Sequence, residues 1–162
     1  MRKAKLKIKY PLWEQLIAEL RGRGHGKRES GALLLAKGQE NEIVRFICYD
    51  DLDPHAFDTG IVRFDTSGFI PLWKICQAEG LQVVADVHTH PSGWTGQSSS
   101  DTYHPIIHQA GHMALIVPHF AMKNQKTLRG VGIYEYLGAY QWKTWTRYSG
   151  IFKIIRYAKR NQ

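Results

Sequence analysis

Apolar residues recur at regular spacings from the N-terminus of the chain onward. Residues 5–10 alternate apolar side chains with lysines, which predicts a strand that directs one face outward. Pro11 suits the first turn of a helix, and the apolar residues within 12–20 recur at helical spacing. The glycine-rich segment 21–26 then ends this predicted helix.

Apolar runs in the next segment predict the central strands of a sheet. The segment 30–36, SGALLLA, is almost continuously apolar over the length of a strand, which predicts a strand buried on both faces. Residues 41–49 are predicted to form its neighbour across the turn 37–40. An acidic loop follows, and a further strand is predicted at Ile61–Phe64.

The second half of the chain alternates predicted helices and strands. Thr66 or Ser67 can cap a helix that runs to about Glu79 and ends at Gly80. The later predicted elements are a strand at 81–90, a helix at 101–111, a strand at 113–120, and a hairpin of residues 130–136 and 139–145 that turns at Leu137–Gly138. This pattern predicts an α/β (α+β) fold: a single domain over residues 1–162 with a mixed sheet flanked by helices, and a basic C-terminal tail at about 147–162.

The composition is that of an ordinary globular protein, with 43% hydrophobic and 22% charged residues among 162. No apolar run approaches the roughly 18 residues of a membrane span. The basic N-terminus lacks the apolar core of a signal peptide, so we expect a cytoplasmic protein without a membrane partner. Cys48 and Cys76 lie in separate apolar stretches, which indicates buried free thiols.

The net charge of +8 concentrates near the two ends of the chain. Such a charge favours acidic partners, either nucleic acid or an acidic protein surface. No stripe of basic and aromatic residues is confined to one predicted element. Solvated termini therefore explain the charge better than a nucleic-acid site, and we do not expect a nucleic-acid partner.

Two histidines one residue apart end the predicted strand at 81–90. Because side chains at i and i+2 of a strand point to the same face, His88 and His90 project together. Pro91 ends the strand by withholding a hydrogen-bond donor, and a Gly/Ser-rich loop then leads to Asp101 at the start of a predicted helix. Two imidazoles and one carboxylate form the three-ligand set of an open catalytic zinc site.

Peptide hydrolysis at such a site needs a further group. Zinc lowers the pKa of a bound water to about 7, but a base must take the proton of that water and an acid must protonate the leaving amine. Glu29, directly before the apolar segment 30–36, is the candidate. A glutamate that follows Lys27 and Arg28 is ordinarily a solvated surface group, and two histidines alone are ordinarily polar residues without a metal. The zinc hypothesis therefore depends on the combined pattern.

The combined pattern closely resembles the JAMM metalloprotease motif, also called MPN+ or JAB1-type. The residues that carry the resemblance are Glu29 before SGALLL, the run His88-Thr89-His90-Pro91, Ser98 and Asp101. Seven residues separate His90 from Ser98, and two residues separate Ser98 from Asp101. The resemblance covers roughly Ile8 to Trp145. It implies that zinc is held by His88, His90 and Asp101. It also implies that Glu29 is the general acid/base and that Ser98 helps to stabilise the oxyanion of a tetrahedral intermediate.

The resemblance also implies a substrate class. Members of this family cleave isopeptide or peptide bonds after the C-terminal glycine of ubiquitin or ubiquitin-like proteins. The small size of the chain is most similar to that of compact prokaryotic JAB-domain isopeptidases. The implied partners are a ubiquitin-like protein or its conjugate and E1-like and E2-like enzymes, including those of antiphage defence systems.

Other residues near the motif have alternative interpretations. His104, His108 and His112 recur every four residues, which fits either partly exposed helix histidines, the preferred interpretation, or a second metal site. Asp86 lies on the strand face of His88 and either orients a ligand or is a satisfied buried polar residue. Trp94 either contacts a substrate tail or covers apolar surface, and His104 is the alternative ligand to Asp101. Trp142 and Trp145 are expected to pack.

Two rival functions remain open at this point. The first is a non-catalytic scaffold, as served by related domains that have lost their ligands. The second is a nucleic-acid-associated protein, because RadC-like proteins share the two-histidine motif and this chain is basic. A scaffold needs none of Glu29, His88 or Asp101, so the isopeptidase is the preferred hypothesis.

Overall fold

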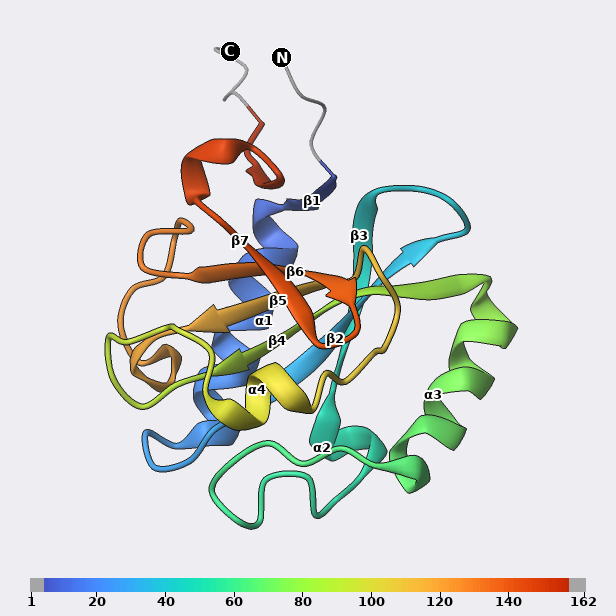
Figure 1. The fold of residues 1–162 in the computed structure, drawn as a ribbon, viewed down its shortest axis with the longest axis horizontal. Coiled ribbons are helices and arrows are strands. Elements are labelled where there is room, and N and C mark those ends of the chain that lie inside the picture. Colours follow the sequence, from blue (N-terminus) through green and yellow to red (C-terminus); the bar gives the residue numbers. More distant parts are fainter. Residues whose placement is uncertain (1–4, 158–162) are drawn as a thin grey trace.

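In the described part of the chain, eight strands form one mixed sheet with helices on both of its faces (Figure 1). The computed structural model describes residues 5–157. The strands are β1 (Leu6–Lys9), β2 (Gly31–Lys37), β3 (Glu42–Cys48), β4 (Leu81–Thr89), β5 (Met113–Val117), β6 (Gly132–Gly138), β7 (Gln141–Trp145) and β8 (Phe152–Ile155). The helices are α1 (Tyr10–Gly24), α2 (Tyr49–Leu52), α3 (Thr66–Glu79) and α4 (Ser99–Tyr103), with the short 3₁₀ helices η1 (His119–Ala121) and η2 (Arg147–Ser149).

The strand order is β7-β6-β5-β4-β2-β3-β1-β8. β1 runs parallel to β3 and β8, and β4 runs parallel to β5. The other neighbouring strands are antiparallel. The predicted fold class, a mixed sheet flanked by helices, is therefore confirmed.

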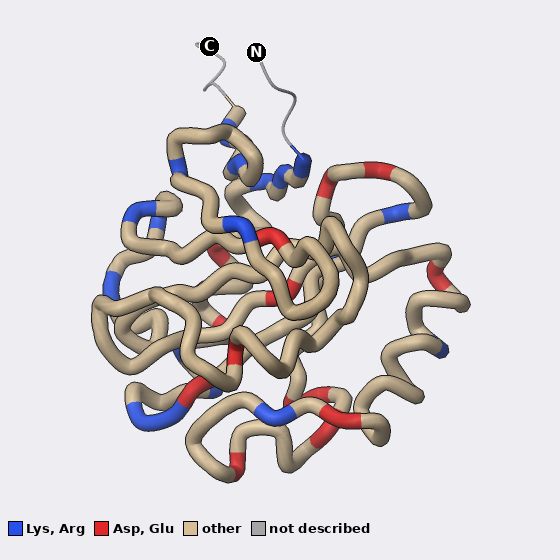
Figure 2. The backbone as a smooth tube through the Cα atoms, in the orientation of Figure 1, with Lys and Arg blue, Asp and Glu red and all other residues tan. Residues whose placement is uncertain are grey.

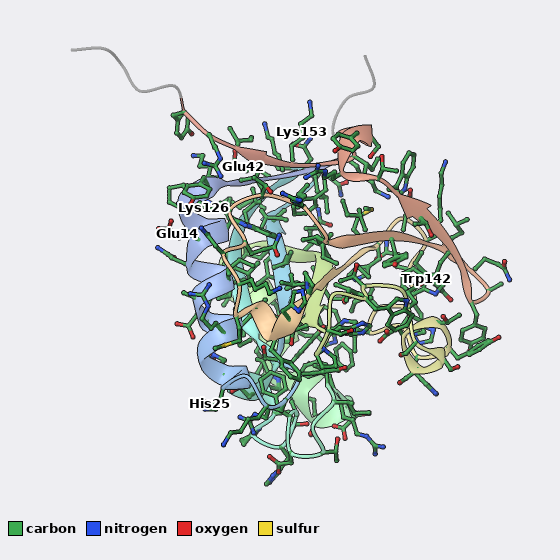
Figure 3. The ribbon with its side chains drawn as sticks, turned by 90° about the vertical axis from the view of Figure 1, so that its left-hand side faces the viewer. Glu14, His25, Glu42, Lys126, Trp142 and Lys153 are labelled. Atoms are coloured by element: carbon green, nitrogen blue, oxygen red, sulfur yellow. The ribbon has the colours of Figure 1, made fainter. Side chains whose placement is uncertain are left out.

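The two faces of β2 pack against different helices. Ala32 and Leu34 belong to the core beneath α1, whereas Leu33 and Leu35 belong to the core of α2 and α3. This division follows from the strand geometry, because successive side chains point to opposite faces. Figure 3 shows α1, marked by Glu14 and His25, on the opposite side of the molecule from Trp142. β2 is thus buried on both faces, as its apolar run predicted.

A close approach between β2 and β4 positions the residues around the histidine pair. Gly31 lies opposite His88, and a Cβ atom at residue 31 would lie 2.6 Å from the carbonyl oxygen of Val87. Just before β2, the Ser30 N–H donates to the Thr89 hydroxyl over 3.0 Å, and the Thr89 N–H donates to the Ser30 carbonyl over 2.9 Å. Hydrogen bonds therefore hold the chain segment that carries Glu29 next to the end of β4.

Two of the predicted elements, the helix at 101–111 and the strand at Ile61–Phe64, differ from the structure. The helix predicted at 101–111 is only α4, which ends at Tyr103, because Pro105 lacks an N–H donor and disfavours helical backbone at His104. The strand predicted at Ile61–Phe64 does not form, and this segment crosses the surface between α2 and α3 without strand pairing. A short apolar alternation was insufficient there because no partner strand lies beside it.

The C-terminal part of the sheet also differs from the prediction. The β6–β7 hairpin turns at Ala139–Tyr140, both with positive φ (49° and 58°), and not at Leu137–Gly138. The expected basic tail from about residue 147 begins instead with η2 and β8, because Phe152 packs in the core and β8 pairs with β1. Residues 158–162 of that predicted tail lie outside the described residues.

Charge is distributed unevenly over the molecule (Figure 2). All acidic residues except Glu135 lie between Glu14 and Asp101 in the sequence, and both ends of the chain are basic. Both cysteines are buried and free, as predicted. Within residues 5–157, no helix combines the length and apolar character needed to cross a bilayer.

Candidate metal centre

The two predicted histidines converge at the end of β4. His88 lies within β4 and His90 directly follows it, and their Nε2 atoms are 3.1 Å apart. Because Val87 packs in the core beneath α1, the neighbouring His88 side chain points to the opposite face, on the side of α2 and α3. The i and i+2 spacing therefore places both imidazoles together, as the sequence predicted.

Asp101 completes a triangle with the two histidines. Its Oδ1 lies 3.2 Å from His88 Nε2, and its Oδ2 lies 3.2 Å from His90 Nε2. Within the described part of the chain, His88, His90 and Asp101 form the group of side chains whose atoms are close enough to hold one metal ion. His90 is only 3% exposed, whereas His88 and Asp101 are partly exposed to the cleft.

The start of α4 determines where Asp101 lies. Ser98 is the N-cap of α4: its hydroxyl oxygen accepts from the Asp101 N–H over 3.1 Å. In return, the Ser98 N–H donates to Asp101 Oδ2 over 2.8 Å. This reciprocal pair is a capping box, and it holds the carboxylate against the helix terminus in a defined rotamer.

The triangle has the size that a tetrahedral metal ion requires. Zinc bonded at about 2.0–2.1 Å keeps its ligand atoms about 3.3 Å apart. This is close to the 3.1 Å between the two Nε2 atoms and to the 3.2 Å from each Nε2 atom to its nearer Asp101 oxygen. The other ring nitrogen of His90, Nδ1, lies 3.2 Å from the Trp94 carbonyl oxygen. When Nδ1–H donates to that oxygen, the lone pair of Nε2 points into the triangle, which is the arrangement of a ligating histidine. The residues present therefore fit a zinc ion.

Protonation equilibria at the cluster favour cation binding by Asp101. Burial raises the pKa of Asp101, but the bonds with His88 and His90 outweigh burial, and the net pKa lies well below its ordinary value. Burial lowers the pKa of His88, but the bond and charge of Asp101 reverse this, and the net pKa is raised. A metal ion therefore competes with a proton for His88, whereas the lowered pKa of Asp101 favours its ionised form.

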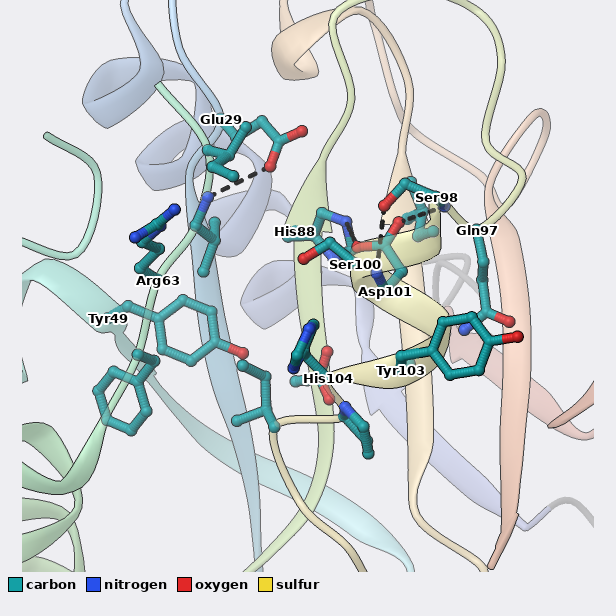
Figure 4. A pocket seen from close by; sticks show the side chains of 18 of the residues that line it. Glu29, Tyr49, Arg63, His88, Gln97, Ser98, Ser100, Asp101, Tyr103 and His104 are labelled. Atoms are coloured by element: carbon teal, nitrogen blue, oxygen red, sulfur yellow. Dashed lines mark hydrogen bonds and ion pairs between the residues drawn. The ribbon is translucent and has the colours of Figure 1, made fainter. Parts of the chain in front are cut away.

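Glu29 lies across the cleft from this cluster (Figure 4). Its Oε2 accepts from the Val62 N–H over 3.3 Å. Burial raises the pKa of Glu29, and the nearby charge of His88 and the bond from Val62 only partly offset this effect. A carboxylate with a raised pKa, close to the histidine pair, has the properties of a group that takes up and releases a proton.

Glu29, His88 and Asp101 line one cleft of about 880 Å³, and the buried His90 lies next to His88. One wall is the segment 61–66, and the other is formed by α4 and the segment that follows it. Asp86, Ala114, Ile116 and Trp142 also line it. A cleft of this volume can take up a ligand beside these groups, since pockets of several hundred Å³ enclose whole small ligands.

The residues near the motif that had alternative interpretations lie in different surroundings. Asp86 is a satisfied buried polar residue, because its Oδ2 lies 2.6 Å from Nε2 of the buried His112. His112 is therefore not a partly exposed helix histidine, and His104 and His108 line the cleft on irregular backbone because α4 is short. Trp94 is 59% exposed and stacks on His90 with ring centroids 5.4 Å apart.

Part of the cleft was not identifiable from sequence. The segment 61–66 lines the cleft, and its first four residues, Ile61–Phe64, were predicted as a strand. It carries no local signal of this role beyond its position between an acidic loop and the start of α3. Trp142 was assigned to packing and does pack on Tyr136, with the two rings tilted by 60°. It also lines the cleft, and its indole N–H donates to the Thr102 carbonyl over 3.1 Å. Only the pairing of β7 with β6, and of β6 with β5, places Trp142 there.

Comparison with known structures agrees with this architecture. No protein-family model matches the chain. The chain has the JAMM/MPN fold, which solved structures share over almost its whole length. A JAB1/MPN domain protein from Archaeoglobus fulgidus aligns with a TM-score of 0.53 and 16% identity, covering 93% of this chain and 98% of that protein.

Two further structures show the same fold. One, described as a JAMM metalloprotease-like zinc site in the proteasome and signalosome, aligns with a TM-score of 0.51 and 16% identity over 95% of this chain and 100% of its own. A protein from Desulfitobacterium hafniense aligns with a TM-score of 0.64 and 14% identity over 96% and 97% of the two chains. At these identities the likeness establishes the fold, and the function depends on the site.

Proposed function

We propose that this protein is a zinc-dependent isopeptidase or peptidase that cleaves after the C-terminal glycine of a ubiquitin-like protein. The observation that carries the proposal is the triangle of His88, His90 and Asp101, sized for a tetrahedral ion, with Glu29 facing it across one cleft. Metal-assisted hydrolysis needs both parts, a metal with an open coordination position and a base beside it.

The residues of the chain divide the chemistry among them. His88, His90 and Asp101 would hold a zinc ion, which when bound would supply Lewis acidity toward a water and the scissile carbonyl. Glu29 accepts the proton of the attacking water and delivers it to the leaving amine. The Ser98 hydroxyl accepts from the Asp101 N–H, so its own proton is available to donate to the negative charge that develops on the carbonyl oxygen.

Zinc is the metal that best fits the proposal. Two histidines and one carboxylate also form the facial triad of non-haem iron enzymes, so the ligand set alone does not select the metal. The shared fold with a protein described as a JAMM metalloprotease-like zinc site favours zinc. The half-buried Glu29 supports the same choice, because a base beside the metal is needed for hydrolysis.

The substrate class and setting rest on the resemblance of the motif. The cleft has room for the extended C-terminal tail of a ubiquitin-like protein or of its conjugate. As functional partners we propose E1-like and E2-like enzymes of a prokaryotic conjugation pathway, and as one setting a cytoplasmic antiphage defence system. A non-catalytic scaffold would need neither the metal triangle nor Glu29. For a RadC-like nucleic-acid-associated protein, the supporting observation is the basic character of the two chain ends.

Purified protein is expected to contain about one equivalent of zinc per chain, because the ligand set is complete within one chain. Elemental analysis of protein prepared without chelators measures this directly. A strong chelator should abolish cleavage, and added zinc should restore it. Protein without metal would contradict the proposal, and iron in place of zinc would redirect it toward oxygen chemistry.

Cleavage is expected to depend steeply on a small residue before the scissile bond. Glycine allows a backbone to approach a metal closely, so replacing the terminal glycine of a cognate tail by leucine should slow cleavage strongly. Rates on matched substrates measure the effect, with a leucine substitution on the folded body of the substrate as the control. Equal rates for the glycine and leucine tails would remove tail specificity from the proposal.

A further inference from the structure

The loop that carries the chain from His90 to Asp101 has little packing of its own. None of residues 91–98 is buried, and Trp94 is largely exposed. Hydrophobic burial therefore cannot hold this loop in place. Its position depends on hydrogen bonds, and the third corner of the metal triangle depends on its position.

Several of these hydrogen bonds join the loop to residues outside it. The His119 N–H donates to the Ser92 carbonyl over 3.0 Å, and the Thr95 hydroxyl donates to the Gly130 carbonyl over 2.8 Å. The shortest is at the centre of the loop, where the Tyr134 hydroxyl donates to the Thr95 carbonyl over 2.6 Å.

Tyr134 is a rigid support for this bond. It lies in β6, is only 8% exposed, and packs against Ala114 and Ile116 of the neighbouring β5. A buried ring on a paired strand has few alternative rotamers, so its hydroxyl marks a fixed point relative to the sheet. Because β5 also pairs with β4, the same sheet carries the histidines and this fixed point.

Gly132 brings the loop close enough for the Tyr134 bond to form. A Cβ atom at residue 132 would lie 2.3 Å from the Thr95 carbonyl oxygen, the oxygen that accepts from Tyr134. The loop backbone therefore passes directly over β6, at a distance that only glycine permits. Gly132 and Tyr134 of β6 therefore both set the position of the Thr95 carbonyl. Gly132 leaves room for it, and the Tyr134 hydroxyl donates to it.

We infer that Tyr134 is a positioning residue for the metal centre, which holds the loop after His90 so that Asp101 reaches the triangle. The inference rests on the proposed zinc site. It assigns Tyr134 no contact with the metal and no part in the chemistry. It predicts that the Tyr134 hydroxyl controls metal affinity and coordination geometry from outside the ligand set, as outer partners of metal ligands commonly do.

The test compares Tyr134→Phe with Tyr136→Phe. Tyr136 lies on the same strand, is 3% exposed, and its hydroxyl accepts from the Tyr140 N–H in the β6–β7 turn, away from the loop. Zinc affinity is measured by competition with a chromophoric chelator. The visible spectrum of Co²⁺ bound in place of zinc reports coordination geometry, and thermal unfolding of the metal-free proteins reports the stability of the fold.

Tyr134→Phe is expected to weaken zinc binding by about tenfold, the lower end of the range for partners outside the ligand set, and to alter the Co²⁺ spectrum. Tyr136→Phe should keep the affinity and spectrum of the unmodified protein. Gly132→Ala, which pushes directly on Thr95, should weaken zinc binding at least as much as Tyr134→Phe.

Unchanged affinity and spectrum in Tyr134→Phe would overturn the inference, and so would an equal loss in both tyrosine variants, because that would indicate a general effect on the sheet. Failure of the proposed zinc site has a different signature: the unmodified protein itself would bind neither zinc nor Co²⁺. That outcome would contradict both proposals. Unchanged zinc affinity and Co²⁺ spectrum in Tyr134→Phe would contradict only the positioning role of Tyr134.

Discussion

Replacing Glu29 with glutamine is expected to lower the cleavage rate by about 10²–10⁴-fold, the usual contribution of a positioned general acid/base, while zinc stays bound. Glutamine keeps the size of the side chain and an oxygen that can accept from the Val62 N–H, so the local structure should be retained. It cannot accept the proton of the attacking water. Zinc content, cleavage rate and substrate affinity should be measured on the same preparation.

Glu40→Gln is the matched control for this experiment, because Glu40 is exposed in the turn between β2 and β3 and lies outside the residues that line the cleft. Its rate should equal that of the unmodified protein. Affinity for substrate should change little in Glu29→Gln, so the variant should trap the complex. Loss of zinc would identify Glu29 as a ligand, and an unchanged rate would remove it from the mechanism.

Replacing His88 or His90 with alanine is expected to abolish both zinc retention and cleavage. Each substitution leaves two ligands where an open catalytic site needs three. A ligand present at a hundred times its dissociation constant stabilises the folded state by about 2.7 kcal/mol. Added zinc should therefore raise the thermal unfolding midpoint of the unmodified protein and leave that of either variant unchanged.

His104→Ala serves as the control for the ligand assignment. His104 lines the same cleft but follows α4 on irregular backbone, and it stands outside the cluster of His88, His90 and Asp101. This variant should retain zinc. If His104→Ala loses zinc while Asp101→Ala retains it, the third ligand has been assigned to the wrong residue.

Local pattern was sufficient to predict the elements that carry the proposed ligands. The apolar run of residues 30–36 predicted the central strand β2, and the pair His88 and His90 was predicted to share one face at the end of β4. These predictions succeeded because burial and side-chain direction along a strand repeat every two residues. The same local reasoning failed at 101–111, where Pro105 interrupts the helical pattern, and at Ile61–Phe64, where no strand is available to pair.

The sequence by itself determined which chemical groups are present and roughly where along the chain each lies: two imidazoles at a strand end, a carboxylate at a helix start, and Glu29 before an apolar strand. Only the tertiary structure decided that these groups face one cleft. Gly31 lets β2 approach β4, and the Ser30–Thr89 bonds then bring Glu29 to the histidines from far away in the sequence. The physical reason is that residue spacing specifies local direction, whereas contacts between distant segments arise only when whole strands pack together.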